Sequence, residues 1–248
     1  MSPARPRSGV ASRLAGIELI VFDKDGTLID FDAMWGSWLA ELTRRLGSAA
    51  DEAIRAELYQ AFGFDPAAGH VLSGGALAGT PMAELRELAV TILTSAGGPR
   101  TAAEATIGRV WQPPDPVALA RPLADVRSLF GALRERGLGI AVATTDDRSP
   151  TEQTLAALDV ADLVDALVCA DDGLPVKPAP DMVWHLCRML GREPSRAAVI
   201  GDSPADLAMG RAAGAGVVIG VLSGIGGRED LAPLADLILP SVAALVEA

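Results

Sequence analysis

The chain has 248 residues, of which 50% are hydrophobic and 4% aromatic, and it carries a formal net charge of −11 at pH 7. That length suffices for one large domain, or for a core domain with a smaller second one. The acidic balance argues against a nucleic-acid partner, which requires a basic patch. It does not exclude small anionic substrates, because a bound metal and a lysine can dominate the field inside a pocket.

No stretch approaches the roughly 20 apolar residues of a membrane span, so we expect no membrane contact and a cytoplasmic location. Residues 1–13 contain arginine and proline but no apolar signal core, and we expect them to form a flexible tail. Cys169 and Cys187 lie far apart, without the spacing of a metal or redox motif. They are expected to be reduced, buried thiols.

An apolar run at residues 17–22 predicts the first buried strand. A block with helical periodicity and no convincing strand follows it. Within this block, a glycine-rich segment at 63–79 is expected to be a long loop, and Thr80-Pro81 an N-cap followed by proline at the first helical position. The predicted helices cover 35–46, 51–62, 81–96 and 101–110. Residues 31–116 are therefore expected to form a helical domain inserted after the first strand.

From Pro122 onward, strands and helices alternate. Ser149-Pro150-Thr151-Glu152 predicts a capping box that opens one helix, and Ser203 opens another that ends at Gly214. The predicted strands are 138–143, 164–169, 197–201, 216–221 and 237–239, with further helices near 123–136 and 179–190. This alternation is typical of a doubly wound parallel sheet, so an α/β core is expected from residues 14–30 and 117–248.

Polar residues follow four of the predicted strands, at the point where each strand ends. They are Asp23 and Asp25, then Thr144-Thr145-Asp146-Asp147, then Lys177 in a loop with two prolines, then Asp202 and Asp206 in Gly201-Asp202-Ser203-Pro204-Ala205-Asp206. The carboxyl ends of parallel strands meet at one edge of the sheet, where ligands bind. We therefore expect all four clusters to converge there.

Each cluster also has an ordinary explanation when it is taken alone. Thr144 fits a turn, Lys177 a solvated surface and Asp206 a helix cap. For Asp146 and Asp147, solvation of a loop is the interpretation we favour. Only the joint pattern argues for a site.

Two clustered carboxylates repel each other unless a cation or a proton lies between them. Mg²⁺, which prefers oxygen ligands, suits such a position. One aspartate could then act as a nucleophile and the other as an acid/base. A hydroxyl and free backbone N–H groups at a strand end can hold a phosphate oxygen.

These motifs resemble those of the haloacid dehalogenase-like superfamily, most closely its phosphoglycolate-phosphatase-like hydrolases with a helical cap. The resemblance rests on Asp-x-Asp-Gly-Thr-Leu at 23–28 and Gly-Asp-Ser-x-x-Asp at 201–206, with Thr144 and Lys177 correctly placed between them. It implies a Rossmann-like core, an inserted cap and a Mg²⁺-dependent phosphatase. The implied substrate is a small phosphorylated metabolite, phosphoglycolate- or sugar-phosphate-like, which reacts through an aspartyl-phosphate.

The resemblance also implies a role for each motif residue. Asp23 is the nucleophile, and Asp25 protonates the leaving oxygen and then activates water. Asp25 also separates phosphatases from the dehalogenases of the family. The other implied roles are Mg²⁺ binding by Asp23, the Asp25 carbonyl and Asp202, support of the metal site by Asp206, phosphoryl binding by Thr144 and the N–H of Thr145, and charge neutralisation by Lys177.

Lys24 departs from the apolar residue that is common in the phosphoglycolate group. It resembles instead some phosphatases of sugar bisphosphates and of histidinol phosphate, although a surface-pointing lysine is an equally fair interpretation. In the cap, the cationic or titratable candidates for substrate contact are Arg44, Arg45, Arg55 and His70. For each of them a solvated helix face is the more typical explanation.

Three other functions remain open at the level of sequence. One is a phosphomutase of the β-phosphoglucomutase type on the same scaffold. Another is a signalling receiver, against which the size of the insert argues, and the third is a binding protein without catalysis. The chain is expected to be a monomer or a homodimer.

Overall fold

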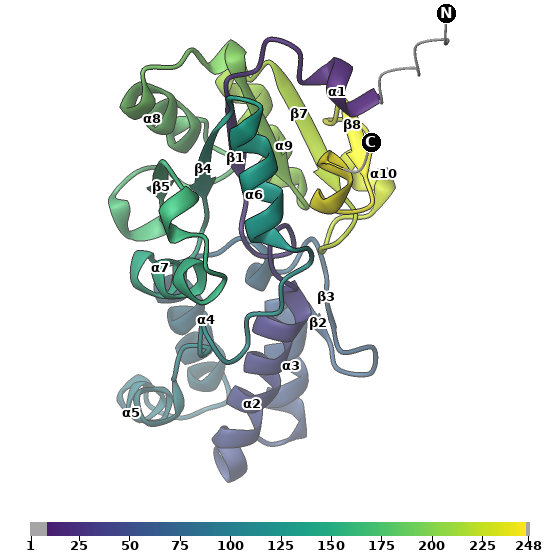
Figure 1. Ribbon diagram of the computed structural model, residues 1–248. Helices are drawn as coiled ribbons and strands as arrows, with labels where there is room; N and C mark the ends of the chain where they lie inside the picture. Colours follow the sequence, from purple (N-terminus) through teal and green to yellow (C-terminus); the bar gives the residue numbers. More distant parts are fainter. Residues whose placement is uncertain (1–8, 247–248) are drawn as a thin grey trace, which may run out of the picture.

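A six-stranded parallel sheet lies at the centre of the core in the computed structural model, which describes residues 9–246 (Figure 1). The strand order is β5-β4-β1-β6-β7-β8. The strands are β1 (Leu19–Phe22), β4 (Gly139–Ala143), β5 (Ala166–Val168), β6 (Ala197–Gly201), β7 (Val217–Val221) and β8 (Leu237–Leu239). The predicted doubly wound α/β fold is confirmed.

Helices cover both faces of this sheet because successive side chains of a buried strand point to opposite faces. Phe22 of β1 stacks on Phe130 of α6, with ring centroids 5.1 Å apart, in a cluster that also contains Val10 of α1. Val21 points the other way and packs with Met209 of α9. The core helices are α1 (Gly9–Arg13), α6 (Val126–Glu135), α7 (Arg148–Ala157), α8 (Asp181–Leu190), α9 (Pro204–Ala213) and α10 (Arg228–Leu231).

A second domain with its own hydrophobic cluster lies below the sheet in Figure 1. Its helices are α2 (Ser37–Leu46), preceded by a short π-helical turn, α3 (Glu52–Phe62), α4 (Met82–Ser95) and α5 (Arg100–Val110). These match the helices predicted for the insert, which we call the cap. The cap is not wholly helical, however, because β2 (Phe64–Asp65) and β3 (His70–Val71) pair as a short antiparallel ladder inside the predicted loop.

Two hydrogen-bonded linkers join the cap to the core. The amide of Asp30 donates to the carbonyl of Arg121 at 2.8 Å, and that of Leu123 donates to Leu28 at 3.0 Å. Ile29 and Ile225 of the core belong to the hydrophobic cluster of the cap. The junction of the two domains therefore lies next to the loop that follows β1.

Several helix starts differ from the predictions. α4 has Pro81 at its N-cap instead of Thr80, and α7 has Asp147 instead of Ser149. In the predicted tail, residues 9–13 form α1 and bury Val10, whereas residues 1–8 lie outside the described part of the chain.

Both cysteines are buried and unpaired, as predicted. Within residues 9–246, no helix combines the length and the apolar character that crossing a bilayer requires.

Candidate active site

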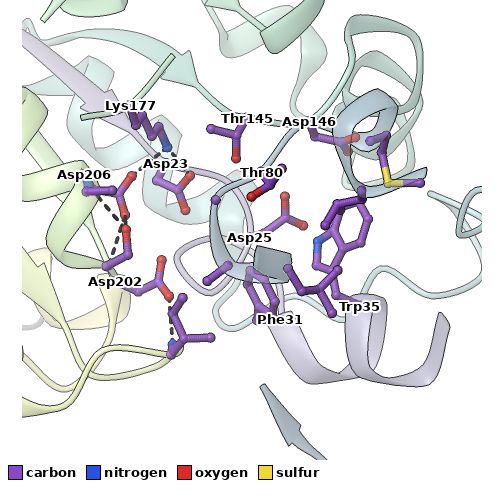
Figure 2. A pocket seen from close by; sticks show the side chains of 18 residues that line it. Asp23, Asp25, Phe31, Trp35, Thr80, Thr145, Asp146, Lys177, Asp202 and Asp206 are labelled. Atoms are coloured by element: carbon purple, nitrogen blue, oxygen red, sulfur yellow. Dashed lines mark hydrogen bonds and ion pairs between the residues drawn. The ribbon is translucent and has the colours of Figure 1, made fainter. Parts of the chain in front are cut away.

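The register of the sheet brings the predicted site residues to one edge. Phe22 at the end of β1 lies beside Val142 of β4 and Ile200 of β6. Asp23, Thr144 and Asp202 follow these paired positions within two residues. Because the three strands end side by side, the loops after them leave the sheet at the same edge. Figure 2 shows the resulting cavity, with Asp23, Asp202 and Asp206 on one side and Phe31 and Trp35 on the other.

Lys177 lies between two aspartates at this edge. Its Nζ is 2.5 Å from Oδ1 of Asp23 and 2.6 Å from Oδ1 of Asp206, and all three side chains are nearly inaccessible to solvent. The other oxygen of Asp206 accepts hydrogen bonds from the amide and the hydroxyl of Ser203, which is the N-cap of α9. Asp206 therefore both caps the helix and contacts Lys177.

Burial and crowding of charge perturb these groups. Burial raises the pKa of Asp23 to about 6, with further increases from Asp206 and Asp25, and Lys177 opposes the shift. Burial alone lowers the pKa of Lys177, but Asp206 and Asp23 outweigh it and raise the pKa above its usual value. Lys177 therefore stays protonated near neutral pH and can offset negative charge on Asp23.

Asp202 is enclosed by the loop after β1 and the loop after β7. Its carboxylate accepts a hydrogen bond from the amide of Ile225 at 2.8 Å and one from the hydroxyl of Thr27 at 3.3 Å. Burial, followed by the charges of Asp23 and Asp206, raises the pKa of Asp202 well above its usual range. The glycine-rich segment after β7, which supplies the contact from Ile225, was not among the predicted site elements.

The acidic residues fit a divalent cation. Asp23, Asp202 and Asp206 each present an oxygen within 4.8 Å of the others. Oδ2 of Asp23 is buried without a hydrogen-bond partner, which is a costly state unless a ligand completes it. Hard oxygen ligands of this kind suit Mg²⁺. The predicted ligation by the carbonyl of Asp25 remains a prediction.

Lys24 and Asp146 belong to the site and not to the surface. The side chain of Lys24 has no solvent exposure, and its Nζ lies 2.7 Å from Oδ2 of Asp25 and 3.1 Å from Oδ2 of Asp146. The surface-pointing interpretation of Lys24 and the loop-solvation interpretation of Asp146 are therefore wrong. The contact between Lys24 and Asp146 joins loops that follow different strands, so no local sequence pattern indicates it.

The two predicted threonines occupy different positions. Thr145 lines the cavity (Figure 2). Thr144 is buried and is not a lining residue, and its hydroxyl accepts a hydrogen bond from the amide of Asp146 at 3.1 Å. Binding of a phosphoryl group by either residue stays a prediction.

The cap side of the cavity is mostly apolar. Its lining residues include Phe31, Trp35, Leu77, Thr80, Met82 and Leu85, to which the core adds Ile225. Among residues 9–246, the cationic side chain that lines the cavity is Lys177. The cap candidates lie elsewhere, because Arg44 and Arg45 pair with Glu41, Arg55 bonds to the carbonyl of Gly47, and His70 pairs with Asp32.

Comparison with known proteins agrees with this geometry. A family model for haloacid dehalogenase-like hydrolases matches residues 17–214. The chain is 36% identical over 121 residues to a phosphoglycolate phosphatase of Rhodospirillum rubrum, a match that covers 48% of this chain and 50% of that protein. The chain thus spans about half the length of this and two other phosphoglycolate phosphatases that it matches.

Longer matches extend across the cap. A validoxylamine A 7'-phosphate phosphatase of Streptomyces hygroscopicus subsp. limoneus is 27% identical over 197 residues, which cover 79% of this chain and 82% of that protein. The fold matches the crystal structure of a predicted phosphoglycolate phosphatase from Haemophilus somnus with a TM-score of 0.67, at 20% identity, over 94% of this chain and 97% of that one.

Proposed function

This chain belongs to the haloacid dehalogenase-like hydrolase family, and on that premise we propose that it is a Mg²⁺-dependent phosphatase of a small phosphorylated metabolite. The observation that carries the proposal is the ion pair of Asp23 with Lys177 in a cavity that Asp25 also lines. The names of two relatives, which specify phosphoglycolate and validoxylamine A 7'-phosphate, support a small phosphate monoester as the substrate.

The proposed reaction has two halves. In the first, a carboxylate oxygen of Asp23 bonds to phosphorus while the bond from phosphorus to the leaving oxygen breaks, and Asp25 gives its proton to that oxygen. In the second, Asp25 takes a proton from the water that attacks phosphorus, which restores Asp23 and releases inorganic phosphate.

Charge neutralisation makes attack on an anionic phosphate feasible. Lys177 contacts the attacking carboxylate at 2.5 Å and offsets part of the charge that accumulates there. Bound Mg²⁺ would add Lewis-acid neutralisation of the phosphoryl oxygens, held by Asp23 and Asp202. The cap covers the cavity and limits access of bulk water to it.

Phosphate release with Mg²⁺ over phosphoglycolate, sugar phosphates, alkyl phosphates and p-nitrophenyl phosphate tests the proposal. We expect turnover of at least one alkyl ester, and an acid-stable, base-labile phosphoenzyme during it. Asp23→Asn should lower kcat by more than about 1,000-fold, because the nucleophile is lost. Glu229→Gln, an exposed carboxylate on α10, should have no effect.

Three outcomes would contradict the proposal in different ways. Full turnover by Asp23→Asn at saturating substrate would remove the nucleophile assignment. Migration of phosphate between substrate positions with little free phosphate would indicate a phosphomutase. No turnover of any compound would favour a binding protein without catalysis.

A further inference from the structure

Lys24 contacts both oxygens of the aspartate that follows it. Its Nζ donates to Oδ1 of Asp25 at 2.9 Å and lies 2.7 Å from Oδ2. The backbone of Lys24 is also fixed, because its carbonyl accepts hydrogen bonds from the amides of Leu28 and Ile29. Rotation of the Asp25 carboxylate away from this position would therefore break two close contacts with a buried ammonium group.

Asp146 holds the other side of Lys24, at 3.1 Å. Its own carboxylate accepts a hydrogen bond from the amide of Asp147 at 2.8 Å, and its carbonyl accepts one from Ala170 at 3.0 Å. The ion pair thus ties the loop after β1 to a firmly bonded loop after β4. Asp146 and Asp25 both line the cavity (Figure 2). Lys24 is fully buried and is not one of the lining residues.

Two observations make a purely structural role an incomplete explanation. Three buried ionised groups are expensive to desolvate, and replacing such a cluster with apolar residues is often neutral or stabilising. In addition, Lys24 and Lys177 are the two lysines of a sequence that otherwise uses arginine for its basic residues. Each lysine lies against one aspartate of the Asp23/Asp25 pair.

We propose that Lys24 is a positioning residue, which holds the carboxyl group of Asp25 in the orientation for proton transfer, and that Asp146 anchors Lys24. The inference rests on the proposed function, in which Asp25 gives a proton to the leaving oxygen. Lys24 takes no part in bond making or breaking, so its effect on the reaction passes entirely through Asp25.

The dependence of rate on the leaving group tests this role. An alkyl phosphate needs a proton at its leaving oxygen, whereas p-nitrophenyl phosphate leaves as a stable anion and hardly needs one. Lys24→Met should lower kcat/KM for the best alkyl phosphate of the phosphate-release panel by about 100-fold or more, within the range of general acid catalysis. For p-nitrophenyl phosphate, kcat/KM should fall less than about 10-fold, with a burst of nitrophenol because the second half-reaction also needs Asp25.

A double-mutant cycle separates positioning from a direct role. Asp25→Asn should show the same selectivity for the leaving group, and adding Lys24→Met to it should lower kcat/KM by less than about 3-fold more. Equal losses on both substrates, or full additivity of the two variants, would overturn the inference. Asp146→Asn, which keeps the shape of the side chain, should lower kcat/KM less than Lys24→Met does, with the same selectivity for the leaving group. It replaces Lys24→Met in the test if that variant does not fold.

NMR spectroscopy can detect the contact of Lys24 with Asp25 directly, because the chain has two lysine side chains to tell apart. With ¹⁵N in the lysine side chains, the signal absent from Lys24→Met identifies Lys24, and Asp25→Asn should shift that signal and leave the Lys177 signal nearly unchanged. An unshifted Lys24 signal would contradict the contact.

If Asp23→Asn keeps turnover, the proposed function fails, whereas normal leaving-group selectivity in Lys24→Met refutes only the positioning role.

Discussion

At the scale of single residues, Asp202 depends on glycines that surround it. A Cβ atom at Gly224 would lie 1.9 Å from Oδ2 of Asp202, and one at Gly26 would lie 2.3 Å from the same oxygen. At Gly226, a Cβ would lie 2.2 Å from the carbonyl oxygen of Asp202. No side chain fits at these distances, so the absence of a Cβ at each position fixes where the Asp202 carboxylate can lie.

Gly224→Ala should therefore displace the Asp202 carboxylate. We expect the Mg²⁺ concentration for half-maximal activity to rise at least about 10-fold, the size of effect typical of residues that orient metal ligands. Titration of phosphatase activity with Mg²⁺ measures this. Gly131→Ala in α6 is the matched control, because its added Cβ meets nothing within 4 Å beyond its chain neighbours and the backbone of its own helix, and Mg²⁺ dependence should not change. An unchanged Mg²⁺ requirement in Gly224→Ala would mean that Asp202 is not a metal ligand.

Individual residues also show where sequence reasoning succeeds and where it stops. Asp23, Lys177 and Asp206 converge as expected, because the end of a parallel strand is a feature that a local apolar run reveals. Sequence reasoning missed the contact of Lys24 with Asp146, because the two residues are far apart in the chain and no local pattern indicates that they are buried together. The role of Gly224 was also missed, because the sequence of a glycine-rich loop does not show which carboxylate packs against it.

At the scale of elements, strands and helices differ in how well their ends could be predicted. β6 and β8 begin and end as predicted, since polar residues flank the apolar run of β6 and Asp236 and Pro240 flank that of β8. The N-cap predicted at Ser203 is correct, because its hydroxyl accepts a hydrogen bond from Asp206. Those at Thr80 and Ser149 are wrong, although each precedes a proline in the same way. A proline restricts the backbone but does not decide which residue before the helix bonds to its free amides.

The start of α4 matters for substrate choice, because Thr80 faces the cavity instead of capping the helix. A carboxylate on the leaving group would meet Asp25, Asp146 and the apolar residues of the cap, and within residues 9–246 the cap adds no cationic side chain to the lining that could balance its charge. Like charges about 4 Å apart at an intermediate dielectric repel by several kcal/mol. We therefore expect a higher kcat/KM for 2-hydroxyethyl phosphate than for phosphoglycolate, which differs from it mainly by the carboxylate.

Thr80→Arg should reverse this preference by placing a cation on the cap side of the cavity. The ratio of kcat/KM for phosphoglycolate to that for 2-hydroxyethyl phosphate should rise about 10-fold or more. Thr80→Gln, which is long, polar and neutral, should leave the ratio near that of the unmodified protein. A preference for phosphoglycolate in the unmodified protein would show that a carboxylate is recognised by groups other than those that line this cavity.

At the scale of the whole molecule, the cap and the core meet over a cluster of acids that opposes folding when it is ionised. Asp23 and Asp202 have raised pKa values, mainly because of burial, so the folded metal-free protein binds more protons than the unfolded chain above about pH 4. Stability then falls as pH rises, through the raised pKa of Asp23 at about 6 and through the raised pKa of Asp202. Lys177, with its raised pKa, stays charged throughout and does not contribute to this slope.

Asp202→Asn should remove part of this pH dependence while it keeps the shape of the side chain. With EDTA, we expect the variant to be more stable than the unmodified protein at pH 8, by roughly 1–3 kcal/mol or several degrees in Tm, and the difference to shrink at pH 5. Mg²⁺ should raise the Tm of the unmodified protein more at pH 8 than at pH 5, because protons compete with the metal for the same carboxylates.

Thermal unfolding at both pH values, with EDTA or with Mg²⁺, measures all of these differences. The same Mg²⁺ should raise the Tm of Asp202→Asn little, whereas the exposed variant Glu229→Gln should respond as the unmodified protein does. Parallel Tm values for Asp202→Asn and the unmodified protein from pH 5 to pH 8 would mean that Asp202 is not held as a destabilising carboxylate. An equal response of both to Mg²⁺ would place the metal elsewhere, and the acidic cluster would then have to be balanced by the substrate and Lys177 alone.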